Sequence, residues 1–217
     1  MCVYVSKSIV NAPGGPKEVF NNWIKKVKDI IKATYRIDFR YTLIGSGSRN
    51  MVICCCNNPN YFDLDYQITL TSWPEKMKPK IIKDIFRNVF NGNKPKGFKD
   101  LKDRSQSLRT KNLSLGYGFD IIITRFDEDN NFYLLYNKKD SNDANNEDYS
   151  WLPRKDMAKY RERIKQISGP VMWNKLRDIY LNKRHDHKDD NSIDKKKSYQ
   201  LFNESVVETL TIFKKNI

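Results

Sequence analysis

Residues 61–71 read YFDLDYQITLT, a run in which apolar and polar side chains alternate. This alternation predicts a β-strand with one buried face. Because successive side chains on a strand point to opposite faces, Asp63 and Asp65 would share one face, with Cα atoms about 7 Å apart. Two carboxylates at that spacing repel each other. A divalent cation such as Mg²⁺ (or Mn²⁺) is the simplest compensation, because carboxylate oxygens suit it.

Two further segments belong with this strand. Residues 45–48 read GSGS and follow the strand-like run FRYTLI, and residues 118–124 read GFDIIIT, which places Asp120 within a predicted apolar strand. A lone carboxylate among apolar side chains is costly unless it is paired or bound to a metal. Glycines let backbone N–H groups approach phosphate. The three segments together predict a site for metal ions and a triphosphate.

The order of the predicted elements gives the fold class. Val19 to Ile31 carry apolar side chains at spacings of three and four, which predicts a helix of about five turns. A strand-rich middle follows, interrupted by a predicted helix at residues 80–90, and then come predicted helices at 155–167, 171–182 and 197–213, with a charged linker at 183–197. This pattern indicates an α+β fold with a mixed sheet. We expect a core at residues 1–137 and a helical C-terminal lobe at 138–217.

Composition limits the function classes. The chain has 217 residues, of which 39% are hydrophobic, and this excludes global disorder. No apolar run approaches the roughly 20 residues that a membrane span requires, and no signal peptide is evident. Cys54, Cys55 and Cys56 are adjacent and cannot easily bridge one another, which favours reduced thiols. We therefore expect a cytoplasmic protein with no membrane partner.

The charge points to an anionic partner. Lys and Arg number 40 against 26 Asp and Glu, giving a net charge of +14. Residues 76–111 are the most basic stretch, with 12 Lys or Arg and 3 Asp. They predict either a surface for RNA or another nucleic acid or a solvated face. An AT-rich genome also enriches lysine, so part of the charge carries no information about partners.

The GSGS turn, the FDLDYQI strand and the FDIIIT strand together resemble the DNA polymerase beta-like nucleotidyltransferase superfamily. The spacing is most similar to the branch that contains cyclic GMP–AMP synthase and oligoadenylate synthase. The resemblance covers roughly residues 18–126. It implies a nucleotidyltransferase-like mixed sheet flanked by helices. It also implies Mg²⁺-dependent transfer of a nucleoside monophosphate from a nucleoside triphosphate to a hydroxyl, with release of pyrophosphate.

The resemblance also implies roles for particular residues. Asp63, Asp65 and Asp120 would bind the metal ions, and Asp120 would help to deprotonate the acceptor hydroxyl. Gly47 and Ser48 would hold the triphosphate, with Gly45 and Ser46 as the alternative frame. Three residues at the start of the last predicted helix would contact the nucleotide, namely Lys197, Ser198 and Tyr199.

Other interpretations remain open at this point. The acceptor could be a nucleotide, giving a linear or cyclic product, an RNA end or a protein side chain. The chain could also be a catalytically inactive member of this fold that binds nucleotide or nucleic acid. His185 and His187 could ligate a metal, although a solvated linker is the simpler interpretation.

Overall fold

The computed structural model describes residues 3–54, 61–139, 147–154, 158–187 and 198–214. They divide into two compact units. One unit comprises Val5–Val52 and Asn60–Lys155, and the other comprises Met1–Tyr4, Ile53–Pro59 and Asp156–Ile217. Each unit is described by itself. The separation into folding domains at residues 1–137 and 138–217 stays a prediction.

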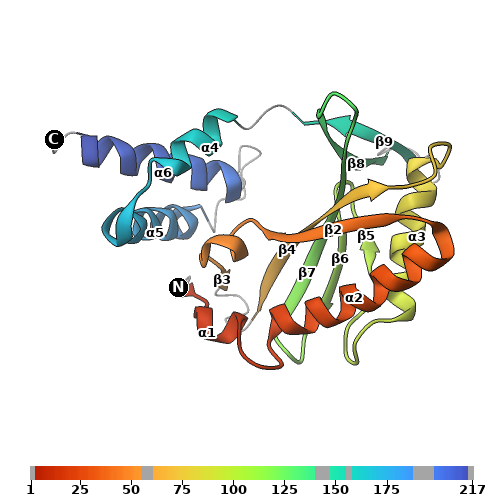
Figure 1. Cartoon of the computed structure of the whole chain (residues 1–217). Coiled ribbons are helices and arrows are strands. Elements are labelled where there is room, and N and C mark those ends of the chain that lie inside the picture. Colours follow the sequence, from red (N-terminus) through yellow and green to blue (C-terminus); the bar gives the residue numbers. More distant parts are fainter. Residues whose placement is uncertain (1–2, 55–60, 140–146, 155–157, 188–197, 215–217) are drawn as a thin grey trace. The chain divides into compact units, whose positions relative to one another are not determined.

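The larger unit is built on a mixed sheet (Figure 1). Its main strands run in the order β2 (Asp38–Ile44), β4 (Phe62–Ser72), β7 (Tyr117–Phe126), β6 (Leu108–Asn112) and β5 (Lys102–Asp103). Strands β4 and β7 are parallel, and the other pairs are antiparallel. Strand β8 (Phe132–Lys139) pairs with β7 and with β9 (Glu147–Pro153). The predicted α+β class with a mixed sheet is confirmed.

Two helices bury their apolar stripes against one face of this sheet. Helix α2 (Pro16–Tyr35) begins at a proline and carries the predicted apolar spacing, and helix α3 (Pro79–Gly92) begins in the same way. The Phe20 ring of α2 stacks on Tyr66 of β4 with centroids 3.6 Å apart, and it lies 5.0 Å from Phe119 of β7. These aromatic contacts fix the core below the two strands that carry the acidic residues.

The other unit contains three helices and a short strand pair. The helices are α4 (Ala158–Lys165), α5 (Gly169–Asp186) and α6 (Ser198–Lys214), and β1 (Val3–Tyr4) pairs with β3 (Ile53–Cys54). The Tyr180 ring of α5 meets Phe202 of α6 edge to face at 5.5 Å. The Tyr4 hydroxyl donates to the backbone carbonyl of Arg177 at 2.5 Å. No described helix is long and apolar enough to cross a membrane.

One segment differs from the prediction. The charged linker expected from residue 183 begins later, since α5 continues to Asp186. His185 and His187 therefore lie at a helix end, within and just after α5, and the latter is its C-cap. Strand β9 begins at Glu147, and its Trp151 lies opposite Leu135 of β8. Residues 140–146 lie outside the described residues.

Candidate active site

The three predicted acidic residues occupy neighbouring strands. Asp65 of β4 pairs in register with Asp120 of β7, and the alternation of β4 puts Asp63 on the same face of the sheet. Leu64 and Tyr66 point to the opposite, helix-covered face, where both are almost fully buried. Figure 1 shows β4 and β7 side by side in the middle of the sheet. The three carboxylates therefore lie on one face of two neighbouring strands.

Burial and mutual repulsion disfavour ionisation of Asp63 and Asp65. Burial first, and then the negative charges of Asp120 and Asp63, raise the pKa of Asp65 to about 7. Burial also raises the pKa of Asp63, although a hydrogen bond from Tyr61 opposes the rise. A carboxylate in this state gains from any cation that comes close. Perturbed acids of this kind are typical of functional sites.

Arg109 is a partner of the acids that the sequence did not reveal. It lies on β6, directly opposite Asp120 in the strand register. Its Nε donates to both carboxylate oxygens of Asp120, at 2.8 and 2.9 Å, and its Nη2 makes a further contact with the same group. The Ser107 hydroxyl approaches Asp120 at 3.3 Å. A guanidinium thus neutralises the third carboxylate in the structure as it stands.

Tyr61 and Gly118 shape the other end of the site. The Tyr61 hydroxyl donates to Oδ1 of Asp63 at 2.7 Å. Gly118 of β7 lies beneath this pair, and a Cβ placed there would stand 2.7 Å from the same Asp63 oxygen. Only glycine leaves room for the carboxylate at this position. Gly118 was visible in the GFDIIIT segment, but its closeness to Asp63 depends on the parallel pairing of β4 with β7.

The Gly-Ser turn contacts the site through its first glycine. Gly45 has a φ of +63°, and a Cβ on it would stand 2.6 Å from Oδ2 of Asp65. Its carbonyl accepts from the Ser48 hydroxyl and from Nη1 of Arg49, each at 2.9 Å. Gly47 instead packs on the other side, where its added Cβ would meet Leu43 and Leu64. The turn is predicted correctly, and the structure shows Gly45 as the glycine beside the acids.

The acids are ligands of the type that a hard cation prefers, but their side chains are not gathered around a common point. Among the residues that the structure describes, no three His, Cys, Asp or Glu side chains stand close enough together to hold a metal ion. The side-chain contacts give the reason, since Asp120 faces Arg109 and Asp63 accepts from Tyr61. The donor set is nevertheless three carboxylates on one face, which fits Mg²⁺ or Mn²⁺. A cation would also relieve the repulsion that raises the pKa of Asp65.

The C-terminal candidates belong to the other unit. Ser198 and Tyr199 form the start of α6, and Tyr199 is 63% exposed. The Ser198 hydroxyl accepts from Nη1 of Arg184. Lys197 lies outside the described residues. Their contact with a nucleotide stays a prediction.

The basic stretch 76–111 is partly neutralised within the protein. Lys83 is buried and lies 2.6 Å from Asp103, while Arg109 pairs with Asp120. Two more of its cations pair with acids at the surface, namely Arg87 with Asp84 and Lys94 with Asp100. The remaining cations, such as Lys76, Lys96 and Lys99, are exposed. The surface available to a nucleic acid is smaller than the charge count indicates.

Comparison with known proteins bears on the fold. No protein-family profile and no curated protein matches the sequence. Among solved structures, the 3′-deoxy GTP-bound form of DncV from Vibrio cholerae is similar, with a TM-score of 0.59, 11% identity, and coverage of 90% of this chain and 59% of DncV. The GTP-bound form of DncV matches with a TM-score of 0.58 and 14% identity, over 95% of this chain and 53% of DncV.

A third form of DncV gives the same result. The cyclic AMP-GMP synthase bound to the linear intermediate pppA(3′,5′)pG matches with a TM-score of 0.58 and 11% identity, over 81% of this chain and 48% of that one. The chain thus spans about half the length of the structures it matches. The expected resemblance is confirmed at the level of the fold, because the chain shares the fold of DncV.

Proposed function

We propose that this protein is a metal-dependent nucleotidyltransferase. It would transfer a nucleoside monophosphate from a nucleoside triphosphate to a hydroxyl group and release pyrophosphate. The observation that carries the proposal is the placement of Asp63, Asp65 and Asp120 on one face of two parallel strands, with Gly45 against Asp65. The same arrangement sits in a fold shared with a synthase that has been solved with ATP and GTP.

The three carboxylates would hold the metal ions. Divalent cations bound there would supply Lewis-acid activation of the acceptor hydroxyl and charge neutralisation for the departing pyrophosphate. Asp120 would accept the proton of the acceptor hydroxyl. Asp65, whose pKa is about 7 in the metal-free site, would release its proton when a cation arrives.

The Gly-Ser turn would hold the triphosphate at the Gly45 end. Of the two frames in the GSGS sequence, we favour Gly45 and Ser46, because Gly45 borders Asp65 while Gly47 packs against Leu43 and Leu64. A side chain at residue 45 would occupy the space beside the carboxylate. Phosphoryl transfer of this kind depends mainly on positioning and on neutralisation of charge.

Arg109 would have two successive partners. In the metal-free protein it neutralises Asp120 through both carboxylate oxygens. A cation at Asp120 would release the guanidinium, which is 46% exposed and therefore free to turn toward a phosphate oxygen. Arg109 would thus position Asp120 first and contact the substrate afterwards.

The acceptor is best sought among nucleotides. DncV has been solved with a linear dinucleotide intermediate, so the hydroxyl of a second nucleotide is the first acceptor to test. The protein would be incubated with each α-labelled triphosphate and each pair, with Mg²⁺ or Mn²⁺. Labelled oligonucleotide and pyrophosphate are the expected products, with loss of both in Asp65→Asn. The exposed Asp29 on α2 gives the control Asp29→Asn, which should retain full activity.

A second candidate function follows from the Arg109–Asp120 pair. A guanidinium bonded to the third acid would also suit an inactive protein of this fold that binds nucleotide or nucleic acid. That reading predicts no turnover with any triphosphate or divalent metal. It also predicts RNA binding that weakens steeply with salt and with substitution of Lys96 and Lys99. Turnover that depends on Asp65 would exclude it.

A further inference from the structure

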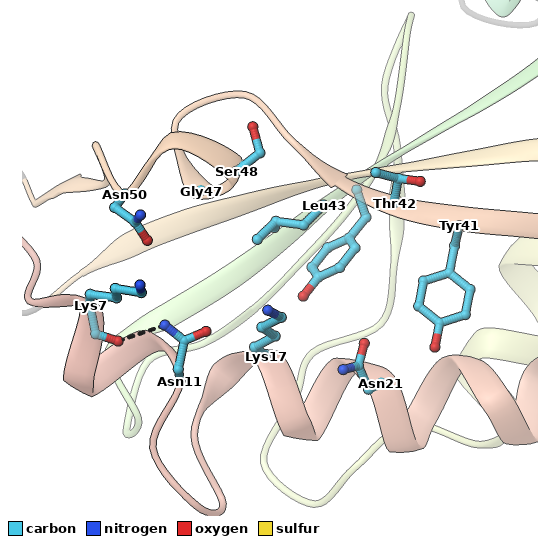
Figure 2. A pocket seen from close by; sticks show the side chains of 11 residues that line it. Lys7, Asn11, Lys17, Asn21, Tyr41, Thr42, Leu43, Gly47, Ser48 and Asn50 are labelled. Carbon is cyan, nitrogen blue, oxygen red and sulfur yellow. Dashed lines mark hydrogen bonds between the residues drawn. The ribbon is translucent and has the colours of Figure 1, made fainter. Parts of the chain in front are cut away.

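A large pocket of the larger unit lies at the end of the sheet away from the acids. Strands β4 and β7 run parallel and end at Ser72 and Phe126, and both of these residues line the pocket. Its volume is about 940 Å³, within the range of small-molecule sites. Asp65 precedes Thr71 of the lining by six residues, which is roughly 20 Å along the strand. Figure 2 shows a different pocket, beside α1 (Lys7–Val10) and the Gly-Ser turn, and the two have no described lining residue in common.

One arginine of the lining is held among three aromatic rings. The guanidinium carbon of Arg125 lies 5.6 Å from the ring centroid of Trp73 and 5.2 Å from that of Tyr133. The ring of Trp151 is closer still, at 4.9 Å. The Nε atom is buried and has no hydrogen-bond partner in the described part of the chain, so the terminal nitrogens are the part of the guanidinium that can face the pocket. Stacking on aromatic faces restrains the guanidinium before any ligand arrives.

No acid among the described residues forms an ion pair with Arg125. The acid two residues later, Asp127, is occupied by the turn between β7 and β8. It accepts from the Tyr133 hydroxyl at 3.0 Å, and from the backbone N–H and the side-chain amide of Asn131 at 2.7 and 3.0 Å. Arg125 therefore keeps donors for an oxyanion from outside the chain, and a carboxylate matches the planar guanidinium well.

The exposed part of the lining carries the opposite charge. Glu75, Glu128 and Asp129 are exposed and form no ion pair in the part of the chain that the structure describes, and we call them the acidic rim. Arg40 and Arg125 are the cations among the described lining residues, so the rim outweighs them in a chain of net charge +14. A multiply charged phosphate would be repelled by the rim. A single carboxylate attached to cationic groups would be attracted by both parts of the lining.

We propose that this pocket binds a basic amino acid through its free carboxylate. The carboxylate would pair with the guanidinium of Arg125, and the cationic groups of the ligand would meet Glu128 and Asp129 of the acidic rim. The aliphatic part of the ligand would lie against Trp73 and Phe126, and Phe126 is 40% exposed. The same chemistry occurs in a free amino acid and at the carboxyl end of a peptide. The site is independent of nucleotidyl transfer, because none of the three acids of the candidate active site lines it.

The experiment is a calorimetric titration of the full chain in EDTA with four probes. L-lysine, L-arginine and trilysine carry the carboxylate, and cadaverine is lysine without it. At least one of the first three should bind with one-to-one stoichiometry, and cadaverine should bind at least about 10-fold more weakly. Tighter binding of trilysine than of lysine would assign the site to a peptide end, and the reverse order would assign it to a free amino acid.

Substitutions locate the binding. Arg125→Lys keeps the charge but loses the planar guanidinium, and it should weaken binding roughly 10-fold. Asp129→Asn should weaken binding about 2- to 5-fold, whereas Asp29→Asn, at an exposed position of α2, should not. Lys17→Gln, in the pocket of Figure 2, should also leave binding unchanged.

The result separates this site from the candidate active site. Binding that falls in Arg125→Lys and Asp129→Asn and survives Asp63→Asn supports the proposal, even if the protein shows no transferase activity. The proposal is overturned if none of the three carboxylate probes binds, or if cadaverine binds as tightly as lysine. It is also overturned if Asp29→Asn or Lys17→Gln weakens binding as much as Arg125→Lys, because the ligand would then bind elsewhere on the protein.

Discussion

Replacing Asp65 by asparagine should stabilise the metal-free protein at pH 8 and have little effect at pH 4. The folded state holds the pKa of Asp65 at about 7, against 3.8 for an ordinary aspartate, because the side chain is buried beside Asp120 and Asp63, with Arg109 opposing the rise. The unfolded chain therefore loses this proton near pH 4, while the folded chain keeps it until about pH 7. Stability falls as pH rises between these values and is flat above them.

The size of the effect follows from that difference in pKa. The pKa of Asp65 is roughly 3 pH units higher in the folded chain, and each unit corresponds to about 1.4 kcal/mol. The free energy of unfolding is therefore lowered by at most about 4 kcal/mol at pH 8. Asparagine is a buried polar group with its own desolvation cost, so we expect a net gain of about 2 kcal/mol. Below pH 4 the Asp65 carboxyl is protonated in both the folded and the unfolded chain of the wild type. The difference in stability between wild type and Asp65→Asn should then nearly vanish.

The assay is urea unfolding in EDTA at pH 4 and pH 8, followed by a Mg²⁺ arm at pH 8. Wild type should gain stability on addition of Mg²⁺, and Asp65→Asn should gain less. Asp29→Asn, at an exposed position, should follow the wild type at both pH values. The reasoning is refuted if Asp65→Asn is less stable than wild type at pH 8, or if the difference between the two proteins is the same at both pH values.

Three further substitutions test the surroundings of the site. Gly45→Ala forces a side chain into a position with a φ of +63°, which should lower the free energy of unfolding by about 1–2 kcal/mol and abolish transfer. The control Gly92→Ala, with no atom within 4 Å of the added Cβ, should do neither. Equal activity of the two variants would contradict the role of the turn. Lys83→Met leaves Asp103 buried without its cation and should cost about 3–5 kcal/mol in urea unfolding, and a cost below about 1 kcal/mol would show that the pair is not needed. Arg109→Gln removes the guanidinium from the third carboxylate, which should lower stability in EDTA by about 1 kcal/mol and tighten Mn²⁺ binding, whereas weaker binding would show that Arg109 assists the metal.

Strand alternation explains why the acids could be predicted. The period of two in YFDLDYQI places Asp63 and Asp65 on one face without any tertiary information, and the predicted helix at Val19–Ile31 follows from its own spacing. Asp120 could be grouped with them because it is a lone carboxylate in an apolar strand, but sequence spacing alone does not pair β4 with β7. The observed register of Asp65 with Asp120 is a property of the sheet.

The contacts that complete the site lie beyond local pattern. Arg109 precedes Asp120 by eleven residues and reaches it only because β6 folds back on β7. In the sequence it is one of twelve cations in a basic stretch and has no distinguishing feature. Tyr66 is similar, since the alternation of its strand predicts burial but cannot show that its hydroxyl lacks a hydrogen-bond partner among the described residues.

The most direct test of the central claim is to count bound Mn²⁺ by electron paramagnetic resonance, with and without a nonhydrolysable triphosphate. We predict that wild type binds Mn²⁺ more tightly when the triphosphate is present. We also predict that Asp63→Asn, Asp65→Asn and Asp120→Asn each lose this binding while remaining folded. Mn²⁺ binding that is unchanged in all three variants would contradict the claim that these carboxylates hold the metal–triphosphate complex.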